Sequence, residues 1–457
     1  MRTLVSGGTV VTATETTEAD VVIEDEKVVA IGRGMSVQAD RTIDATGRYV
    51  MPGGVDVHTH MELPFGGTFC SDDFETGTRA AAFGGTTTIV DFAVQDYGEG
   101  LRQGLDRWFE KAQKACTDYG FHVIVREVND GVLEEMDELV GEGVTSFKLF
   151  MAYPGVFMLD DASIFRAMRQ AADSGALIMM HAENGGPIDV LVRQFLEEGK
   201  TDPVNHGLTR PAVMEGEAVH RVFKLAELAR TPAYIVHLSS RDALNAVREA
   251  RDRGMPAFAE TCPQYLYLSL DDMAGPGFEG AKYVCSPPLR TADHQEELWT
   301  GLKAGDLQVV STDHAPFNYA GQKDLGKDDF SKIPNGLPSV EDRFTLLYGG
   351  VEAGHIGLNR FVDLVATTPA KMFGLYPRKG TIAPGSDADL VVFDPTKDRT
   401  ISAESHHMNV DYSAYEGRAV RGLPEVVMQR GQVLVENGEF HGKAGRGTFL
   451  PRSRLSV

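Results

Sequence analysis

Gly54-Val55-Asp56-Val57-His58-Thr59-His60 is the stretch from which the fold can be predicted, because apolar Val55 and Val57 alternate with polar residues as in a short β-strand. Residues two apart on a strand point to the same side, so His58 and His60 would direct two imidazoles at one point. Neutral imidazole is the commonest metal ligand, which makes a transition metal the natural occupant. The pair alone is a weak motif, since the chain has 13 histidines in 457 residues.

From Met51 onward, short apolar strands alternate with helix-length amphipathic stretches. This rhythm is typical of βα units around a parallel sheet. Eight strands favour a closed (β/α)8 barrel of the TIM type, an α/β fold, over an open sheet. The predicted strands span residues 55–60, 86–93, 121–128, 145–150, 177–181, 233–238, 257–260 and 308–313.

Both ends of the chain carry further strand-like segments outside the barrel pattern. They lie at residues 9–12, 20–24, 27–31 and 41–44, and again at 389–393, 425–428 and 432–435. We predict that the two ends form one small β-sandwich domain. Residues 1–51 would be its N-terminal part, 52–375 the barrel, and 376–457 its C-terminal part followed by an arm. The arm, Phe440–Val457, has little apolar periodicity, and we expect a neighbouring subunit to order it.

Composition excludes several classes of partner. The formal net charge of −22 repels phosphate backbones and anionic lipid, so neither nucleic acid nor a membrane surface is an expected partner. The chain shows no signal-peptide pattern and no apolar run of the roughly 20 residues that a membrane span needs. Four cysteines without C-x-x-C spacing indicate no disulfide framework, which predicts a cytoplasmic protein.

Polar side chains end several of the other predicted strands. His181 follows the run Leu177-Ile178-Met179-Met180, His237 follows another apolar run, and Asp313 ends the last strand. Active sites of such barrels lie at the C-terminal ends of the strands. One histidine at one strand end is more often a satisfied buried residue than a ligand. Four histidines and an aspartate at four strand ends favour a metal centre.

Lys148 stands among large apolar residues in Ser146-Phe147-Lys148-Leu149-Phe150, where a lysine is rarely buried unpaired. It could reach solvent, pair with a carboxylate or form a Schiff base. A further interpretation also explains the imidazoles: burial lowers the pKa of the amine, which adds carbon dioxide, and the resulting carbamate bridges two cations. Two divalent cations with four neutral imidazoles and one aspartate carry a net charge of about +3, which a carbamate and a hydroxide reduce to about +1.

Taken together, these motifs resemble those of the cyclic amidohydrolases, in particular the D-hydantoinase/dihydropyrimidinase branch of the amidohydrolase superfamily. The resemblance runs nearly end to end. It rests on His58-Thr59-His60, Phe147-Lys148-Leu149-Phe150, His181-Ala182-Glu183-Asn184, His237-Leu238-Ser239-Ser240, Ser311-Thr312-Asp313-His314, Glu260-Thr261-Cys262-Pro263-Gln264-Tyr265, Ser286-Pro287-Pro288-Leu289-Arg290, Ile333-Pro334-Asn335-Gly336 and Gly385-Ser386-Asp387-Ala388-Asp389-Leu390.

The resemblance implies a pair of metal ions with assigned ligands. His58, His60 and Asp313 would hold one ion, His181 and His237 the other, and carbamylated Lys148 would bridge them. Zinc is expected, although the ligand types would also accept manganese or cobalt.

The expected reaction is hydrolysis of the ring amide bond of a cyclic ureide, a hydantoin or dihydropyrimidine, to an N-carbamoyl amino acid. A hydroxide bridging the two ions would attack the ring carbonyl, and Asp313 would carry the proton from the water to the leaving nitrogen.

The resemblance also implies substrate contacts. Tyr153 matches a tyrosine that stabilises the oxyanion, and Ser286 and Asn335 match positions whose backbone groups read the cyclic imide edge. Without the resemblance, Tyr153 could equally be a loop aromatic that only packs. Leu63, Phe65, Phe150 and Phe157 are candidates for selecting the exocyclic substituent, or they pack on one another as a lid. Asp313 directed at the metals would leave His314 directed away from them.

Three other functions compete. A dihydropyrimidinase-like protein without catalysis would lack metal ligands, whereas all six are present. A dihydroorotase-like enzyme would carry an arginine shortly after the H-x-H motif, where this chain has Met61-Glu62-Leu63. Allantoinase shares the ligand set and stays open. The remaining histidines are expected to be structural or solvated, and the family resemblance implies a homotetramer.

Overall fold

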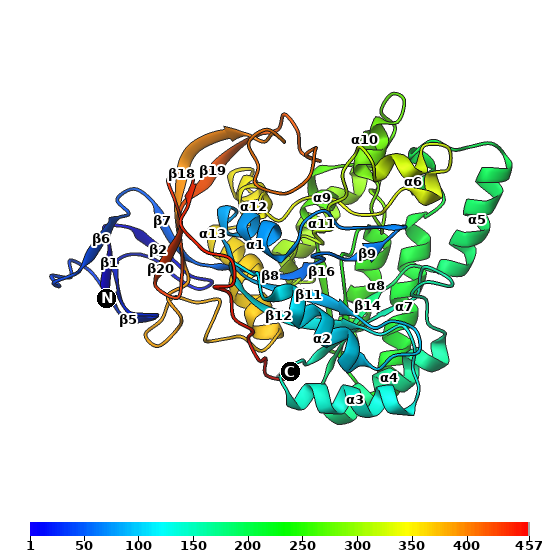
Figure 1. Cartoon of the computed structure of the whole chain (residues 1–457), viewed down its shortest axis with the longest axis horizontal. Coiled ribbons are helices and arrows are strands. Elements are labelled where there is room, and N and C mark those ends of the chain that lie inside the picture. The colour runs from blue at the N-terminus through cyan, green and yellow to red at the C-terminus, as the bar shows by residue number, and fades with distance from the viewer. Residues whose placement is uncertain (456–457) are drawn as a thin grey trace.

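The computed structural model describes residues 1–455, which form a β/α barrel and a β-rich part beside it (Figure 1). Eight barrel strands lie parallel, each hydrogen-bonded to the next along the chain. The ring is completed between its last and first strands by a bridge from Thr59 to His314. This confirms the predicted barrel. Its strands are β8 (Gly54–Thr59), β11 (Thr86–Val94), β12 (Asp118–Ile124), β13 (Ser146–Phe150), β14 (Leu177–His181), β15 (Ala233–Ile235), β16 (Ala257–Thr261) and β17 (Val309–Val310).

Three strands differ from the predicted bounds by more than one residue at an end. Strand β12 was predicted at 121–128 but begins at Asp118, which pairs with Thr88, and ends at Ile124. Beyond it, the N–H groups of Arg126 and Glu127 donate to the Gln95 side chain instead of a neighbouring strand. Strands β15 and β17 end early because the backbone soon turns left-handed, at positions described below.

Helices cover the outside of the barrel, and their ends follow the expected capping chemistry. The Asp160 side chain accepts from Ser163 N–H at the start of α4, and Ser240 accepts from Ala243 N–H at the start of α8. The main helices are α1 (Phe74–Phe83), α2 (Leu101–Ala112), α3 (Asp130–Gly141), α4 (Asp161–Ser174), α5 (Gly185–Glu197), α7 (Ala212–Ala229), α8 (Arg241–Asp252), α11 (Gln295–Ala304) and α12 (Arg343–Glu352). None of the helices in residues 1–455 is long and apolar enough to span a membrane.

Two long connections near the C-terminal ends of the strands contain only short helices. The first holds α9 (Pro263–Tyr267), α10 (Leu270–Met273) and the 3₁₀ helix η1 (Glu279–Tyr283). The second holds the 3₁₀ helices η3 (Lys323–Gly326) and η4 (Phe330–Lys332). These segments carry Ser286 and Asn335 to the mouth of the barrel.

The β-rich part contains two sheets, and the larger combines both ends of the chain. Strand β18 from the C-terminal region pairs with β7 (Tyr49–Pro52), so orange and blue strands lie side by side in Figure 1. The sheets have the orders β5-β4-β1-β6 and β21-β20-β19-β18-β7-β2-β3. Their strands are β1 (Arg2–Ser6), β4 (Asp20–Glu24), β5 (Lys27–Gly32), β6 (Arg41–Asp44), β2 (Thr9–Val11), β3 (Thr16–Glu18), β18 (Leu390–Thr400), β19 (Ala419–Gln429), β20 (Gln432–Glu436) and β21 (Glu439–Phe440).

Buried apolar side chains from both ends of the chain form one cluster in this part, among them Val21, Val50, Leu390 and Met428. Together with the barrel, this agrees with the predicted fold class. The predicted limits 1–51, 52–375 and 376–457 stay a prediction, and the first of them falls inside β7.

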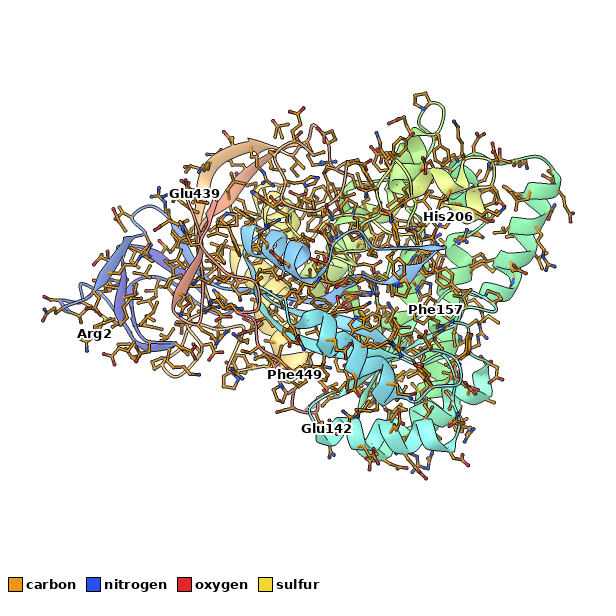
Figure 2. The ribbon with its side chains drawn as sticks, in the orientation of Figure 1. Arg2, Glu142, Phe157, His206, Glu439 and Phe449 are labelled. Carbon is orange, nitrogen blue, oxygen red and sulfur yellow. The ribbon has the colours of Figure 1, made fainter. Side chains whose placement is uncertain are left out.

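The C-terminal arm packs against the barrel of its own chain. Phe449 lies 4.9 Å from Phe109 and 6.0 Å from Phe121 between ring centroids, and it is seen beside the barrel in Figure 2. Leu450 is fully buried, and Arg452 donates to the Phe121 carbonyl and to Ser146 Oγ. Phe440, His441 and Arg446 contact β19 and β20, so both the β-rich part and the barrel of the same chain supply partners to the arm. That a neighbouring subunit orders the arm stays a prediction. Residues 456–457 lie outside the described residues.

Candidate active site

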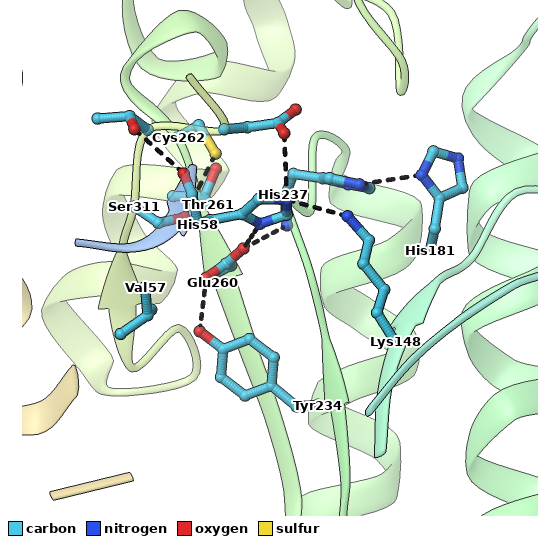
Figure 3. A network of polar contacts seen from close by, with 12 residues as sticks. Val57, His58, Lys148, His181, Tyr234, His237, Glu260, Thr261, Cys262 and Ser311 are labelled. Carbon is cyan, nitrogen blue, oxygen red and sulfur yellow. Dashed lines mark hydrogen bonds and ion pairs between the residues drawn. The ribbon is translucent and has the colours of Figure 1, made fainter. Parts of the chain in front are cut away.

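Six predicted metal ligands converge at the C-terminal end of the barrel, and four of them, His58, Lys148, His181 and His237, are labelled in Figure 3. Strand β8 contributes His58 and is followed by His60, β13 carries Lys148 and β14 ends in His181, while His237 and Asp313 follow β15 and β17. All six side chains are at most 10% exposed. The structure thus brings together every residue that the sequence assigned to the metal centre.

The first three ligands form a compact group. Asp313 Oδ1 lies 3.1 Å from His58 Nε2 and 3.2 Å from His60 Nε2. One ligand atom from each of these residues lies within 4.8 Å of the other two, a spacing that could hold a metal ion.

The second group has two imidazoles and needs a further ligand. His181 Nδ1 lies 3.0 Å from His237 Nε2, and Lys148 Nζ lies 3.0 Å from His58 Nε2. The Lys148 amine lies beside the first group. If it were carboxylated, it would supply an anionic oxygen donor, which the two imidazoles of the second group lack. The donor set therefore fits two cations when Lys148 is modified.

Two buried carboxylates behind the histidines select their tautomers. Glu260 Oε1 accepts a hydrogen bond from His58 Nδ1, and Glu183 Oε2 accepts one of 2.7 Å from His181 Nε2. Each bond leaves the lone pair on the other ring nitrogen, which faces the cluster. Tyr234 Oη donates in turn to Glu260 at 2.7 Å.

The roles of Glu260 and Glu183 were missed from the sequence. A signal existed for Glu260, because it ends an apolar strand as the ligand histidines do. No comparable signal existed for Glu183 beyond its place two residues after His181.

Burial lowers the pKa of three of the nitrogen ligands. It lowers the pKa of Lys148 to about 8 and that of His60 to about 3, because a charged form loses hydration. Burial also lowers the pKa of His237 well below its ordinary value, and the neighbouring His181 adds to this shift. Although burial and Lys148 oppose it, the pKa of His58 is raised instead, because Asp313 and Glu260 outweigh these effects. A lysine that releases its proton near neutral pH can react with carbon dioxide.

Three of the site residues have left-handed backbones although none is glycine. The φ angles are 64° for Tyr153, 38° for His237 and 49° for Asp313. Such conformations cost on the order of 1–3 kcal/mol each and cluster at functional sites. Here they end β15 and β17 and turn the side chains of His237 and Asp313 toward the cluster.

A small cavity of about 50 Å³ opens above the ligands. One wall is polar: Asn335 Nδ2 donates to Ser286 Oγ at 3.1 Å and to Tyr153 Oη at 3.3 Å. The facing wall is apolar, with the Phe157 ring 4.9 Å from Phe150 and 6.2 Å from Phe65. The apolar candidates, including Leu63, both line the cavity and pack on one another.

Other histidines occupy distinct environments. His314 Nε2 faces Asp72 at 3.0 Å and His122 Nδ1 faces Ser146 Oγ at 2.5 Å, so both have partners away from the ligand cluster. His206 was expected to be structural or solvated. It is buried, and its Nε2 lies 3.2 Å from Ser286 Oγ and 2.8 Å from the Cys285 carbonyl oxygen.

Comparison with known proteins agrees with this arrangement. A profile described as the Amidohydrolase family matches residues 49–434. A D-hydantoinase from Streptomyces coelicolor is 58% identical over 458 residues, covering 99% of this chain and 98% of the relative. The chain belongs to the amidohydrolase family.

Further relatives define the branch. A D-hydantoinase from Geobacillus stearothermophilus is 52% identical, with 100% of this chain and 98% of the relative covered. The crystal structure of a dihydropyrimidinase from Brevibacillus agri superposes with a TM-score of 0.99 at 53% identity, covering 100% of both chains. These similarities confirm the D-hydantoinase/dihydropyrimidinase branch that the sequence motifs indicated. This amidohydrolase is therefore a cyclic amidase of a metal-dependent family.

Proposed function

We propose that this amidohydrolase hydrolyses the ring amide bond of cyclic ureides, hydantoins and dihydropyrimidines, to give N-carbamoyl amino acids. The observation that carries the proposal is the convergence of His58, His60, Lys148, His181, His237 and Asp313 beneath a cavity walled by Tyr153. The names of the full-length relatives support the substrate class.

The proposed cofactors are two divalent cations. His58, His60 and Asp313 would hold one, His181 and His237 the other, and Lys148, modified by carbon dioxide, would contribute to both. Zinc suits these nitrogen and oxygen ligands, and manganese or cobalt are also compatible. When bound, the two cations would supply a hydroxide nucleophile bridging them near neutral pH and polarise the ring carbonyl.

The residues of the chain would manage the protons and the developing charge. Asp313 is placed to accept the proton of the attacking water and return it to the leaving nitrogen. Burial raises the pKa of the Tyr153 phenol, so its hydroxyl stays protonated and can donate to the oxyanion.

Ser286 and Asn335 are proposed to bind the ring through their backbones. Within residues 1–455, the N–H and C=O groups of neither residue form a hydrogen bond with another protein group. Polar backbone groups beside a cavity are available to pair with an imide edge, C(=O)–NH–C(=O). Leu63, Phe65, Phe150 and Phe157 would then contact the substituent of the ring.

The test is hydrolysis by metal-free protein reconstituted with zinc and bicarbonate. Dihydrouracil, 5-phenylhydantoin and allantoin are compared at equal concentration. We expect ring opening of the first two and little of allantoin. Preference for allantoin would support the allantoinase alternative, and no hydrolysis of any ring would support a non-catalytic dihydropyrimidinase-like protein.

The carbamate is tested separately by native mass spectrometry and metal analysis. We expect a labile carboxyl adduct on Lys148 and two cations per chain. A bare amine together with clearly fewer than two cations would contradict the two-metal proposal.

Assembly and location complete the proposal. We propose a homotetramer from the family resemblance. Exposed Val190 on α5, with Val213 and Leu228 on α7, are each at least 55% exposed and offer apolar contact area. Light scattering would measure the mass. All four cysteines are unpaired and buried, which supports a reducing cytoplasm.

A further inference from the structure

Lys323 is fully buried beneath the polar wall of the cavity, although a lysine rarely occupies such a position. Burial lowers its pKa to about 7, which shows how unfavourable the surroundings are for a charge. Its ammonium takes no part in the chemistry proposed above. A buried lysine of this kind needs compensating contacts.

The compensating contacts are three backbone carbonyls. Lys323 Nζ donates to the oxygens of Val284, Pro334 and Gly336, each at 2.8 Å. An ammonium has three N–H donors, so its hydrogen-bonding capacity is used completely.

These carbonyls belong to the two segments that carry the proposed ring-binding groups. Val284 lies two residues before Ser286, and Pro334 and Gly336 flank Asn335 on both sides. The segments also contact each other directly, because Gly336 N–H donates to the Val284 oxygen at 3.0 Å. Lys323 thus joins one segment to the other at their buried side.

Gly336 shows that this junction is tight. Its φ is +149°, and a Cβ atom there would lie 2.3 Å from the Ala315 oxygen. The backbone around Asn335 is therefore held between Ala315 on one side and Lys323 on the other.

We propose that Lys323 is a positioning residue that fixes the spacing of the Ser286 and Asn335 backbones and so sets recognition of the cyclic imide edge. This inference rests on the proposed function. A misplacement of about 1 Å at a binding group costs up to about a hundredfold in rate. The three hydrogen bonds from Lys323 Nζ would therefore affect which substrates the backbones of Ser286 and Asn335 bind. Asn335 C=O would accept the imide N–H, which is the group that N3-methylation of a hydantoin removes.

The test compares Lys323→Met with the matched control Lys379→Met. Lys379 is also a buried lysine, but its partners are Asp118, Asp387 and Asp389, away from the cavity. Both proteins are first shown to be folded by circular dichroism at the assay temperature and to retain the metal content of the wild type.

For Lys323→Met we expect KM for hydantoin to rise about tenfold with a smaller change in kcat. We also expect the preference for hydantoin over N3-methylhydantoin, measured as a ratio of kcat/KM, to fall at least fivefold. Lys379→Met should keep both the KM and the ratio of the wild type. The same ratio of dissociation constants, measured by calorimetry with metal-free protein, gives a readout independent of turnover.

A Lys323→Met protein with wild-type KM and wild-type ratio would overturn the inference. If that variant does not fold, Lys323→Arg, which keeps a charged donor but not three bonds from one atom, is measured in the same way, and unchanged selectivity again overturns it. A wild-type protein that opens no cyclic ureide would instead contradict the proposed function.

Discussion

Glu260 orients the most buried of the proposed metal ligands. It accepts from His58 Nδ1, from His237 N–H at 3.2 Å and from Tyr234 Oη, so one carboxylate organises two ligand-bearing strands. Carboxylates that hold a ligand histidine raise its basicity and fix its ring. Their loss weakens metal binding even though they do not touch the ion.

Glu260→Gln is expected to lower the affinity for zinc about 10- to 100-fold, because an amide keeps the shape but loses the charge behind His58. Titration against a competing chelator measures the affinity. Tyr234→Phe, which removes only a neutral donor to Glu260, should have a smaller effect. Equal zinc affinities for wild type and Glu260→Gln would contradict this role.

Tyr153→Phe is expected to lower kcat on the order of a hundredfold, because one oxyanion donor is lost while the ring still packs. Metal content should stay at the wild-type level. Tyr97→Phe is the control, since Tyr97 Oη donates to the Val156 carbonyl rather than into the cavity. Near-normal turnover of Tyr153→Phe at saturating substrate would rule out the oxyanion role.

At the scale of elements, the segment from Phe150 to Phe157, at the end of β13, supplies the rings of Phe150 and Phe157 to the apolar wall. Its outer end is held by Arg126, whose Nε donates to the Val156 oxygen at 3.0 Å. The Arg126 guanidinium also lies 4.2 Å from the Tyr97 ring centroid and 5.2 Å from that of Phe157. Arg126 therefore holds the segment that carries Phe157, and Tyr97 Oη donates to the same Val156 oxygen.

Arg126→Met is expected to raise KM for 5-phenylhydantoin about tenfold, since the charged hydrogen bond and the stacking that hold the segment are both lost. KM for unsubstituted hydantoin should change less, because that ring has no substituent to contact Phe157. Arg166→Met is the control, because Arg166 pairs with exposed Asp130. Equal changes for both substrates would show that Arg126 does not act through this wall.

The eight barrel strands could be predicted from the sequence more accurately than the residues at which they begin and end. Alternating and apolar runs revealed all eight barrel strands, because burial requires those patterns whatever the loops do. The left-handed residues His237 and Asp313 could not be foreseen, since neither is glycine and their conformation is imposed by packing and chemistry.

Histidine ligands were predicted because each ends a recognisable strand. Lys323 and His206 lie in long connections without periodic patterns, and only the three-dimensional structure places them beside Ser286 and Asn335.

At the scale of the whole molecule, a buried charge cluster joins the barrel to the β-rich part. Lys379 Nζ lies 2.7 Å from Asp118 in β12 and 2.8 Å from Asp389, beside β18. Although burial opposes the charge, Asp389, Asp118 and Asp387 raise the pKa of Lys379 to about 12. Burial also opposes ionisation of Asp387, yet Lys379 and Lys27 lower its pKa to about 2.

The directions of the pKa shifts of Asp387 and Lys379 set the pH range over which these two groups stabilise the fold. The contribution of Asp387 is complete above its ordinary pKa of 3.8 and is lost as pH falls toward 2. The contribution of Lys379 is complete below 10.5 and is lost as pH rises toward 12. We therefore expect Lys379 and Asp387 to stabilise the fold from about pH 4 to about pH 10. Burial raises the pKa of Asp389, so ionisation of that carboxyl opposes folding.

Lys379→Met is expected to lower the free energy of unfolding by about 3–5 kcal/mol at pH 8, because Asp118, Asp387 and Asp389 lose the buried cation that they share. The loss should be smaller at pH 5, where those carboxyls can take up protons. Urea denaturation at both values measures it. Lys27→Met, which removes a half-exposed partner of Asp387, should cost less than about 1 kcal/mol. Equal losses in the two variants would contradict a special role for Lys379.

The arm packed against the barrel links parts of the chain that lie far apart in the sequence. Arg452 bonds to Phe121 in β12 and Ser146 in β13, across sequence separations of 331 and 306 residues. Because Leu450 and Arg452 are buried in these contacts, detachment of the arm would expose this part of the barrel to solvent.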